Sequence, residues 1–179
     1  MNHPSIPQHN PNANVHSMEE WTSLSSSVTQ LIVDCCCCCN RDQLKTLDFS
    51  NWRALKVIEI GSHSFQFVAT VKIVGLNELE RVVIGKNCFT YEQANGPKPN
   101  CRFTLKDCEK LTELKVARIC FYGYGVCEIE NNPSLEVIEM GEMGWVSNVF
   151  HFASLTLSSN PPRIRVMNRL GCVAILPVW

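Results

Sequence analysis

The feature that most constrains the fold is a short apolar pattern that recurs along the chain. In its clearest copy, LERVVIG at 79–85, a leucine is followed by aliphatic residues three and five positions later and by a small residue at the sixth. The pattern also begins at Leu55, Leu111 and Leu135. Ten residues after each leucine comes an aromatic residue preceded by a small one. These aromatics are Phe65, Phe89, Phe121 and Trp145. Four copies that agree at six positions predict a repeat protein.

Each repeat has a second apolar pair, whose first member lies eight residues before the next leucine, as Val71 does before Leu79. Alternating Val and Ile residues favour β-strands, and the spacing of 3.6 typical of a helix is lacking. We therefore expect a mainly β solenoid with two short strands per coil of about 24 residues. A less regular first coil is marked by Val28, Leu31 and Val33. The five expected coils are 28–54, 55–78, 79–110, 111–134 and 135–160.

One repeat is longer than the others. Leu111 follows Leu79 by 32 residues, whereas Leu79 follows Leu55 by 24. The excess falls in the run YEQANGPKPN at 91–100. A solenoid tolerates such an insertion because the extra residues bulge from one coil without disturbing its neighbours. We expect a protruding loop whose Tyr91 and Lys98 are available for contact, or else a tolerated insertion without a role.

The two ends of the chain lie outside the repeats. Residues 1–27 are rich in Asn, Pro and His and lack periodicity, which predicts a disordered polar tail. Its histidines His3, His9 and His16 are either weak metal ligands or incidental members of that tail. Residues 161–179 match no repeat position, which predicts an irregular tail or a partial cap. A truncated family member would end in the same way.

Charge and hydropathy exclude several classes of protein. A net charge of −1 gives no electrostatic footprint for nucleic acid, and no run of 18 apolar residues is present to form a transmembrane segment. The amino terminus lacks the basic and apolar regions of a secretory signal. The chain also has no glycosylation sequon, so we expect a cytoplasmic location.

Eleven cysteines are present, and five of them are consecutive at 35–39. Cys88, Cys120 and Cys127 occupy small or apolar positions of the repeat, which predicts buried thiols. The run at 35–39 cannot converge on one metal, because adjacent side chains of an extended chain point in opposite directions. Acylation, redox chemistry and an expansion in a tolerant turn remain as alternatives for this run.

A protein-binding face is expected on the outside of the first strands. The pleat turns the residues two and four positions after each leucine outward, and stacked coils align them in ladders. There, Arg81 lies beside Glu113 and Lys115, close enough to pair across coils. With Tyr91 and Lys98, the candidate binding residues are Glu59, Arg81, Val83, Glu113, Lys115, Val137 and Glu139. No motif for catalysis or phosphate binding occurs, so we expect no enzyme, metal or cofactor.

The motif Leu-x-x-Leu-x-Ile-x-x-x-x-Phe at a period of 24 residues resembles a leucine-rich repeat. The corners GSHSF and GKNCF look like those of the BspA-like class. At the position of the family's asparagine ladder, only Asn87 matches; the other residues there are His63, Ile119 and Met143. The resemblance implies a non-catalytic scaffold that binds another protein. The alternatives are a structural module that self-associates through an uncapped last coil, and a truncated family member with no independent function.

Overall fold

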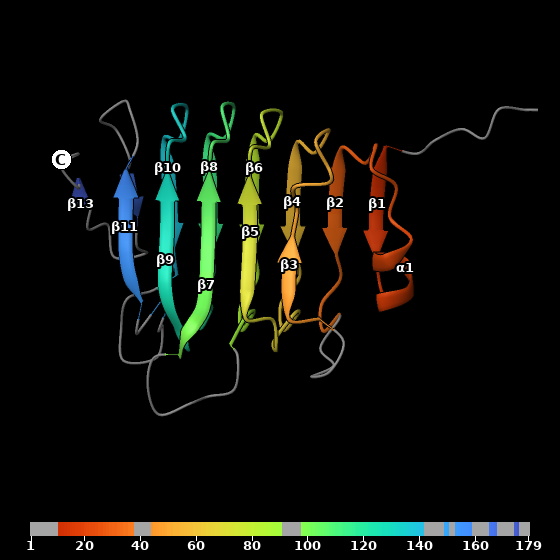
Figure 1. Cartoon of the computed structure of the whole chain (residues 1–179), viewed down its shortest axis with the longest axis horizontal. Coiled ribbons are helices and arrows are strands. Elements are labelled where there is room, and N and C mark those ends of the chain that lie inside the picture. The colour runs from red at the N-terminus through yellow and green to blue at the C-terminus, as the bar shows by residue number, and fades with distance from the viewer. Residues whose placement is uncertain are drawn as a thin grey trace, which may run out of the picture.

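The computed structural model describes residues 11–37, 44–90, 98–141, 149–150, 153–158, 165–167 and 174–175. It is mainly β, with two layers of strands. Within each layer the strands lie side by side along the long axis, which is horizontal in Figure 1. The first elements are β1 (Asn12–Val15), α1 (Met18–Thr22), β2 (Gln30–Val33), β3 (Thr46–Asp48), β4 (Val57–Ile60), β5 (Thr70–Val74) and β6 (Arg81–Ile84). The others are β7 (Lys98–Lys106), β8 (Glu113–Val116), β9 (Tyr124–Glu130), β10 (Val137–Met140), β11 (Ser154–Ser158), β12 (Arg165–Met167) and β13 (Ala174–Ile175).

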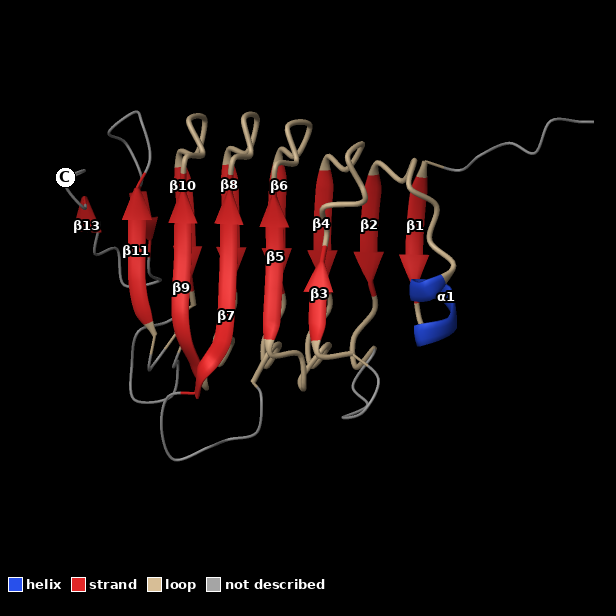
Figure 2. Ribbon diagram, in the orientation of Figure 1, coloured by secondary structure: helices blue, strands red, loops and turns tan. Residues whose placement is uncertain are grey.

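The strands form two sheets between which the chain alternates. The eight-stranded sheet has the order β1-β2-β4-β6-β8-β10-β12-β13, and the five-stranded sheet has the order β11-β9-β7-β5-β3. All strand pairs are parallel except β12 with β13. Figure 2 shows how the turns join one layer to the other at both strand ends. Parallel pairing within each layer follows, because each repeat contributes one strand to each sheet.

Equivalent residues of successive repeats lie directly opposite one another. Ile58 pairs with Val82, Val82 with Leu114, and Leu114 with Ile138. Leu31 of β2 pairs with Ile58, which confirms the alignment of the irregular first repeat. In β4, β6, β8 and β10 half-buried residues alternate with buried ones, as the sequence predicts. The inward and outward positions of these strands are therefore confirmed.

A column of phenylalanine rings runs through the core between the sheets. Phe65 and Phe89 are stacked with their ring centroids 5.9 Å apart, and Phe89 and Phe121 with theirs 4.9 Å apart. The predicted fourth member, Trp145, lies outside the described residues. Its place is taken by Phe150, whose ring is stacked 4.6 Å from that of Phe121. The Phe150 N–H donates to the Cys120 carbonyl, as the Phe121 N–H does to the Cys88 carbonyl. The sequence pattern therefore places the core ring of this repeat five residues too early, at Trp145 instead of Phe150.

The prediction of a disordered tail over 1–27 is wrong for residues 11–27. β1 extends the eight-stranded sheet by pairing with β2, and the helix α1 brings Trp21 onto the end of the core. The Trp21 ring makes edge contacts with Phe49, Trp52 and Phe65 at centroid distances of 6.0, 5.3 and 5.2 Å. Burial of this large ring provides the driving force to order a polar segment. The first ten residues lie outside the described part.

Two further boundaries differ from the sequence predictions. The insertion expected as a loop over 91–100 is shorter, because Lys98 already belongs to β7 and pairs with Tyr124. The irregular tail expected over 161–179 contains β12, which continues the parallel sheet next to β10, and β13, which closes it antiparallel. The eight-stranded sheet therefore extends beyond the last predicted repeat, and the end expected to be uncapped carries two more strands. Among the described residues, no helix has the length and apolarity that crossing a bilayer requires.

Candidate functional site

The strand register brings seven of the nine candidate residues together on the outer face of the eight-stranded sheet. One row consists of Val57, Arg81, Glu113 and Val137, and the other of Glu59, Val83, Lys115 and Glu139. All eight side chains are half-buried. Lys98 lies on the five-stranded sheet, away from these rows, and Tyr91 lies outside the described residues.

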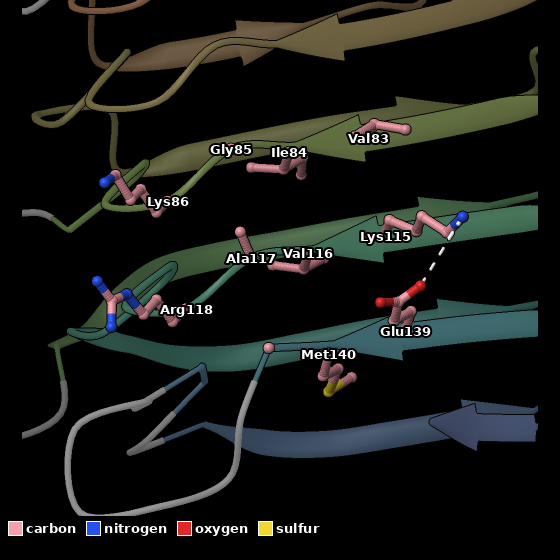
Figure 3. Close-up of a pocket in the computed structure, with 11 residues that line it drawn as sticks. Val83, Ile84, Gly85, Lys86, Lys115, Val116, Ala117, Arg118, Glu139 and Met140 are labelled. Atoms are coloured by element: carbon pink, nitrogen blue, oxygen red, sulfur yellow. Dashed lines mark ion pairs between the residues drawn. The ribbon is translucent and has the colours of Figure 1, made fainter. Parts of the chain in front are cut away.

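A groove of about 490 Å³ lies on this face, over the carboxyl ends of β6, β8 and β10. It contains three of the expected residues, Val83, Lys115 and Glu139, and two that sequence reasoning missed, Lys86 and Arg118. Figure 3 shows Lys86 and Arg118 at the turn end of the groove and the Lys115–Glu139 pair at the other end. The remaining lining residues are apolar or small: Ile84, Gly85, Val116, Ala117, Met140 and Gly141.

Two glycines line the groove where strands β6 and β10 end. A Cβ built on Gly85 would lie 2.6 Å from the Ser62 backbone nitrogen, and one on Gly141 would lie 2.5 Å from that of Arg118. Real Cβ atoms do not approach other atoms so closely, so glycine allows adjacent backbones to pack here. The absence of side chains at these two positions lets the backbone of one repeat lie directly against that of the next.

The turns that follow β6 and β8 project their first residue outward. Lys86 and Arg118 occupy this first position, and both are exposed. The next residue, Asn87 or Ile119, has a left-handed backbone with φ near 60°. This backbone reversal directs the chain back inward, so that Phe89 and Phe121 enter the core three residues after the exposed cation. The repeat thus fixes where Lys86 and Arg118 stand relative to the groove.

The third turn position holds a column of hydroxyl and thiol groups. The Ser64 hydroxyl donates to the Asp34 carbonyl over 2.7 Å and accepts from the Cys37 N–H over 3.2 Å. The thiols of Cys88 and Cys120 donate to carbonyls of the preceding repeat, those of Gly61 and Gly85, over 3.2 and 3.0 Å. Buried backbone carbonyls are thereby satisfied by this column instead of by stacked asparagines.

The two stacked thiols differ in acidity because of their surroundings. Burial raises the pKa of Cys120 well above its ordinary value. The pKa of Cys88 is lowered instead, chiefly by the hydrogen bond that Cys88 makes with Cys120. Desolvation likewise raises the pKa of Cys108 to about 11. Cys88, Cys120 and Cys127 are fully buried, as the sequence predicts. Of the run at 35–39, residues 35–37 lie in the expected turn, where Cys37 is buried in the column and Cys35 and Cys36 are exposed.

Ion pairs neutralise most of the charge on the strand rows. Lys115 Nζ lies 2.8 Å from Glu113 Oε1 and 3.8 Å from Glu139 Oε2. Arg81 pairs with Glu59, where the sequence suggested Glu113 and Lys115 as its neighbours across the repeats. By contrast, no ion pair joins Lys86 or Arg118 to a carboxylate within the described part of the chain. The groove therefore has an internally paired end and a basic end.

The outer face of the five-stranded sheet carries a different arrangement of charge. Lys106 Nζ lies 3.2 Å from Glu128 and 3.0 Å from Glu130, and Lys72 lies 4.0 Å from Asp48. At one end of that sheet a polar hollow of about 680 Å³ is lined by Arg53, Gly75, Asn77, Asp107, Glu109, Asn131 and Pro133. Its polar groups bind one another, since Arg53 donates to the Gly75 carbonyl over 2.7 Å and Asn131 binds Asp107.

Over the described ranges, no three His, Cys, Asp or Glu side chains are placed to hold a metal ion. Comparisons with protein-family models, with curated proteins and with solved structures found no match to this chain. The case for a function accordingly depends on the geometry of the groove and its surroundings.

Proposed function

We propose that the chain is a leucine-rich-repeat-type solenoid of about five coils that acts as a non-catalytic scaffold for binding another protein. Support comes from the repeat of about 24 residues, the parallel pairing of equivalent strands and the stacked phenylalanine column. Such a stack makes an extended, continuous face out of short strands, and repeat proteins use faces of this kind for recognition.

The observation that carries the proposal is the groove over β6, β8 and β10. It combines an apolar floor, which includes Val83 and Ala117, with charged groups at both ends. Apolar surface supplies affinity in a protein interface, and charges at the rim supply orientation and specificity. The outer side of the five-stranded sheet differs, because its Lys72 and Lys106 are paired with carboxylates and the hollow at its end is lined mainly by polar residues.

Site-specific photo-crosslinking tests this proposal. A photoreactive side chain is placed at Val83, in the groove, and in a matched protein at Lys72, which is exposed on the other sheet. Both proteins are added to extract of the source cell and irradiated. We expect a distinct protein adduct from position 83 that excess unmodified chain competes away, and no such adduct from position 72. Identical adducts from both positions, or none from position 83, would contradict a binding role for this face.

Self-association is a second candidate, favoured by the edge of the five-stranded sheet. In the described part of the chain β11 pairs only with β9, and no described strand pairs with its other edge. Unpaired strand edges are templates for pairing between chains. Light scattering over a range of concentrations distinguishes the two candidates: a mass that rises with concentration supports self-association, and a constant monomer mass contradicts it.

A reducing compartment such as the cytoplasm suits the thiol column. Cys88 and Cys120 act as hydrogen-bond donors to the Gly61 and Gly85 carbonyls, which requires each to be a protonated thiol. Oxidation of either side chain removes that donor and leaves a buried carbonyl without its partner. We therefore propose that the protein works where thiols stay reduced.

A further inference from the structure

Two cations stand at equivalent places in neighbouring repeats at the turn end of the groove. Lys86 follows Ile84 by two residues, Arg118 follows Val116 by two, and Ile84 pairs with Val116 in the sheet. Neighbouring parallel strands lie about 4.8 Å apart, so the backbone positions of the two cations are separated by about one strand spacing. Both side chains are exposed and extend to the same end of the groove in Figure 3.

Within the described lining of the groove, no carboxylate neutralises these two charges. The one acidic side chain in that described lining, Glu139, is engaged with Lys115 at the opposite end, where Lys115 also binds Glu113. Between the two ends lie Val83, Ala117 and Met140, which carry no charge. The groove thus has a local excess of positive charge in a chain whose 16 basic residues are outnumbered by 17 acidic ones.

We propose that this groove binds an extended, acidic segment of the partner protein, an inference that rests on the proposed scaffold function. Two carboxylates of that segment pair with Lys86 and Arg118, and an apolar side chain on the same face of the segment lies against Val83 and Ala117. In an extended chain, side chains at alternate positions share a face and are about 6.6–6.8 Å apart. The flexible stems of lysine and arginine adapt to that spacing, and the arginine fork suits a carboxylate.

Charge complementarity favours a peptide over a nucleic acid. A polyanion gains affinity from long stripes of cations along its backbone. This groove instead ends at the Lys115–Glu139 pair, whose carboxylate repels phosphate, and it has an apolar floor that a phosphate backbone does not fill. Acidic side chains at alternate positions, with an apolar side chain on the same face of the segment, match both the basic end and the floor.

The test is a selection of short randomised peptides, displayed on phage, against the full chain. The recovered peptide that binds best is then measured by fluorescence anisotropy against three proteins: the wild type, the K86E/R118E variant and the K72E/R102E variant. The last is a matched control, because it also reverses one lysine and one arginine, both exposed on neighbouring strands of the other sheet.

We expect the recovered pool to be rich in Asp and Glu at alternate positions. The K86E/R118E variant should weaken binding about tenfold or more, since each ion pair is lost and replaced by repulsion, while K72E/R102E changes it less than about twofold. Replacing the acidic residues of the peptide with Gln or Asn should weaken binding to the wild type about as much. Raising the salt concentration should weaken it further.

Several results would overturn the inference. These are a selection that enriches no peptide, a pool without acidic residues, equal losses from both variants, and displacement of the peptide by single-stranded DNA at equal charge concentration. If the Val83 photo-crosslink to a protein persists in the K86E/R118E background, the scaffold function stands and only the acidic-segment inference fails. If the position 83 crosslink is absent in the wild type, the scaffold function itself fails.

Discussion

Two positions of the same turn, three residues apart, meet opposite environments. Phe89 is fully buried and is stacked between Phe65 and Phe121, whereas Lys86 is exposed at the groove. The next repeat shows the same contrast between Phe121 and Arg118. The inward position recurs as phenylalanine because each ring packs on its own copy. The outward position varies because nothing inside the molecule constrains it, and that leaves it available for recognition.

The largest effect is expected where the inward column is broken. Replacing Phe89 with Ala removes a ring that lies 5.9 Å from Phe65 and 4.9 Å from Phe121, centroid to centroid, and should lower the free energy of unfolding by about 3–5 kcal/mol. Urea denaturation followed by circular dichroism measures this. A loss no greater than that of Glu59→Ala, an outward substitution, would mean that the inward and outward positions are not distinct.

An intermediate effect is expected at the third turn position. Ser64→Ala removes the hydroxyl that binds the Asp34 carbonyl and the Cys37 N–H and should cost about 1–3 kcal/mol in urea denaturation. Ser64→Cys is the matched control and should cost less, because Cys88 and Cys120 already fill the equivalent position. Equal costs for the two substitutions would show that packing, and not hydrogen bonding, is the role of this column.

Almost no effect on stability is expected at the outward position. Lys86→Ala should change the free energy of unfolding by less than about 0.5 kcal/mol, since the side chain is exposed and has no ion pair among the described residues. The same variant should weaken binding of an acidic peptide in the anisotropy assay. A clear loss of stability would show that the Lys86 side chain helps to hold the turn together, as the Phe89 ring does. That result would contradict the distinction between the two positions.

The smallest effect on stability is expected at the turn after β2, where Asp34 makes one contact toward the core and one on the surface. Its carbonyl accepts from Ser64 inside, and its carboxylate pairs outside with His16. The hydrogen bond to Asp34 and the charge of Asp34, with a smaller contribution from Glu20, raise the pKa of His16 above 6.5. The pair therefore stabilises the fold fully below pH 6.5, and this contribution is lost as the pH rises through the raised value.

NMR titration of the His16 ring tests this prediction. The wild type should titrate above pH 6.5, and Asp34→Asn should bring the midpoint back toward that ordinary value. Asp34→Asn keeps the backbone carbonyl that binds Ser64, so the inward contact is preserved. An unchanged midpoint in the variant would show that the outward pair does not form in solution.

The sequence predicts the inward half of this molecule better than the outward half. The strands, their register and the rings of Phe65, Phe89 and Phe121 follow from spacing, because stacked copies impose one spacing on every repeat. Phe150 was missed because the last repeat has extra residues before its turn, so a fixed offset of ten pointed to Trp145. The pairing of β12 with β10 was missed because Arg165–Met167 does not follow the leucine pattern.

The amino-terminal elements had a local signal that periodicity does not detect. Ser17 and Glu20 have the spacing of a capping box, and the Ser17 hydroxyl accepts from the Glu20 N–H. Lys86 and Arg118 could have been found by aligning the residue that follows the small residue of each repeat, a row that runs Cys35, Ser62, Lys86, Arg118 and Glu142, of which Glu142 lies outside the described residues. Within the described residues, Lys86 and Arg118 have no carboxylate partner. This depends on the geometry of the strands and turns, which the spacing of residues in the sequence does not predict.

A double-mutant cycle on the phenylalanine column tests most directly that like side chains of successive repeats pack on one another. Phe89→Leu, Phe121→Leu and the double variant are unfolded in urea and compared with the same cycle on Phe65 and Phe150, which are not in ring contact. The account predicts a coupling energy of about 0.5–1.5 kcal/mol between Phe89 and Phe121 and additivity within about 0.5 kcal/mol for the distant pair. Additivity within that limit for Phe89 and Phe121 as well would contradict it.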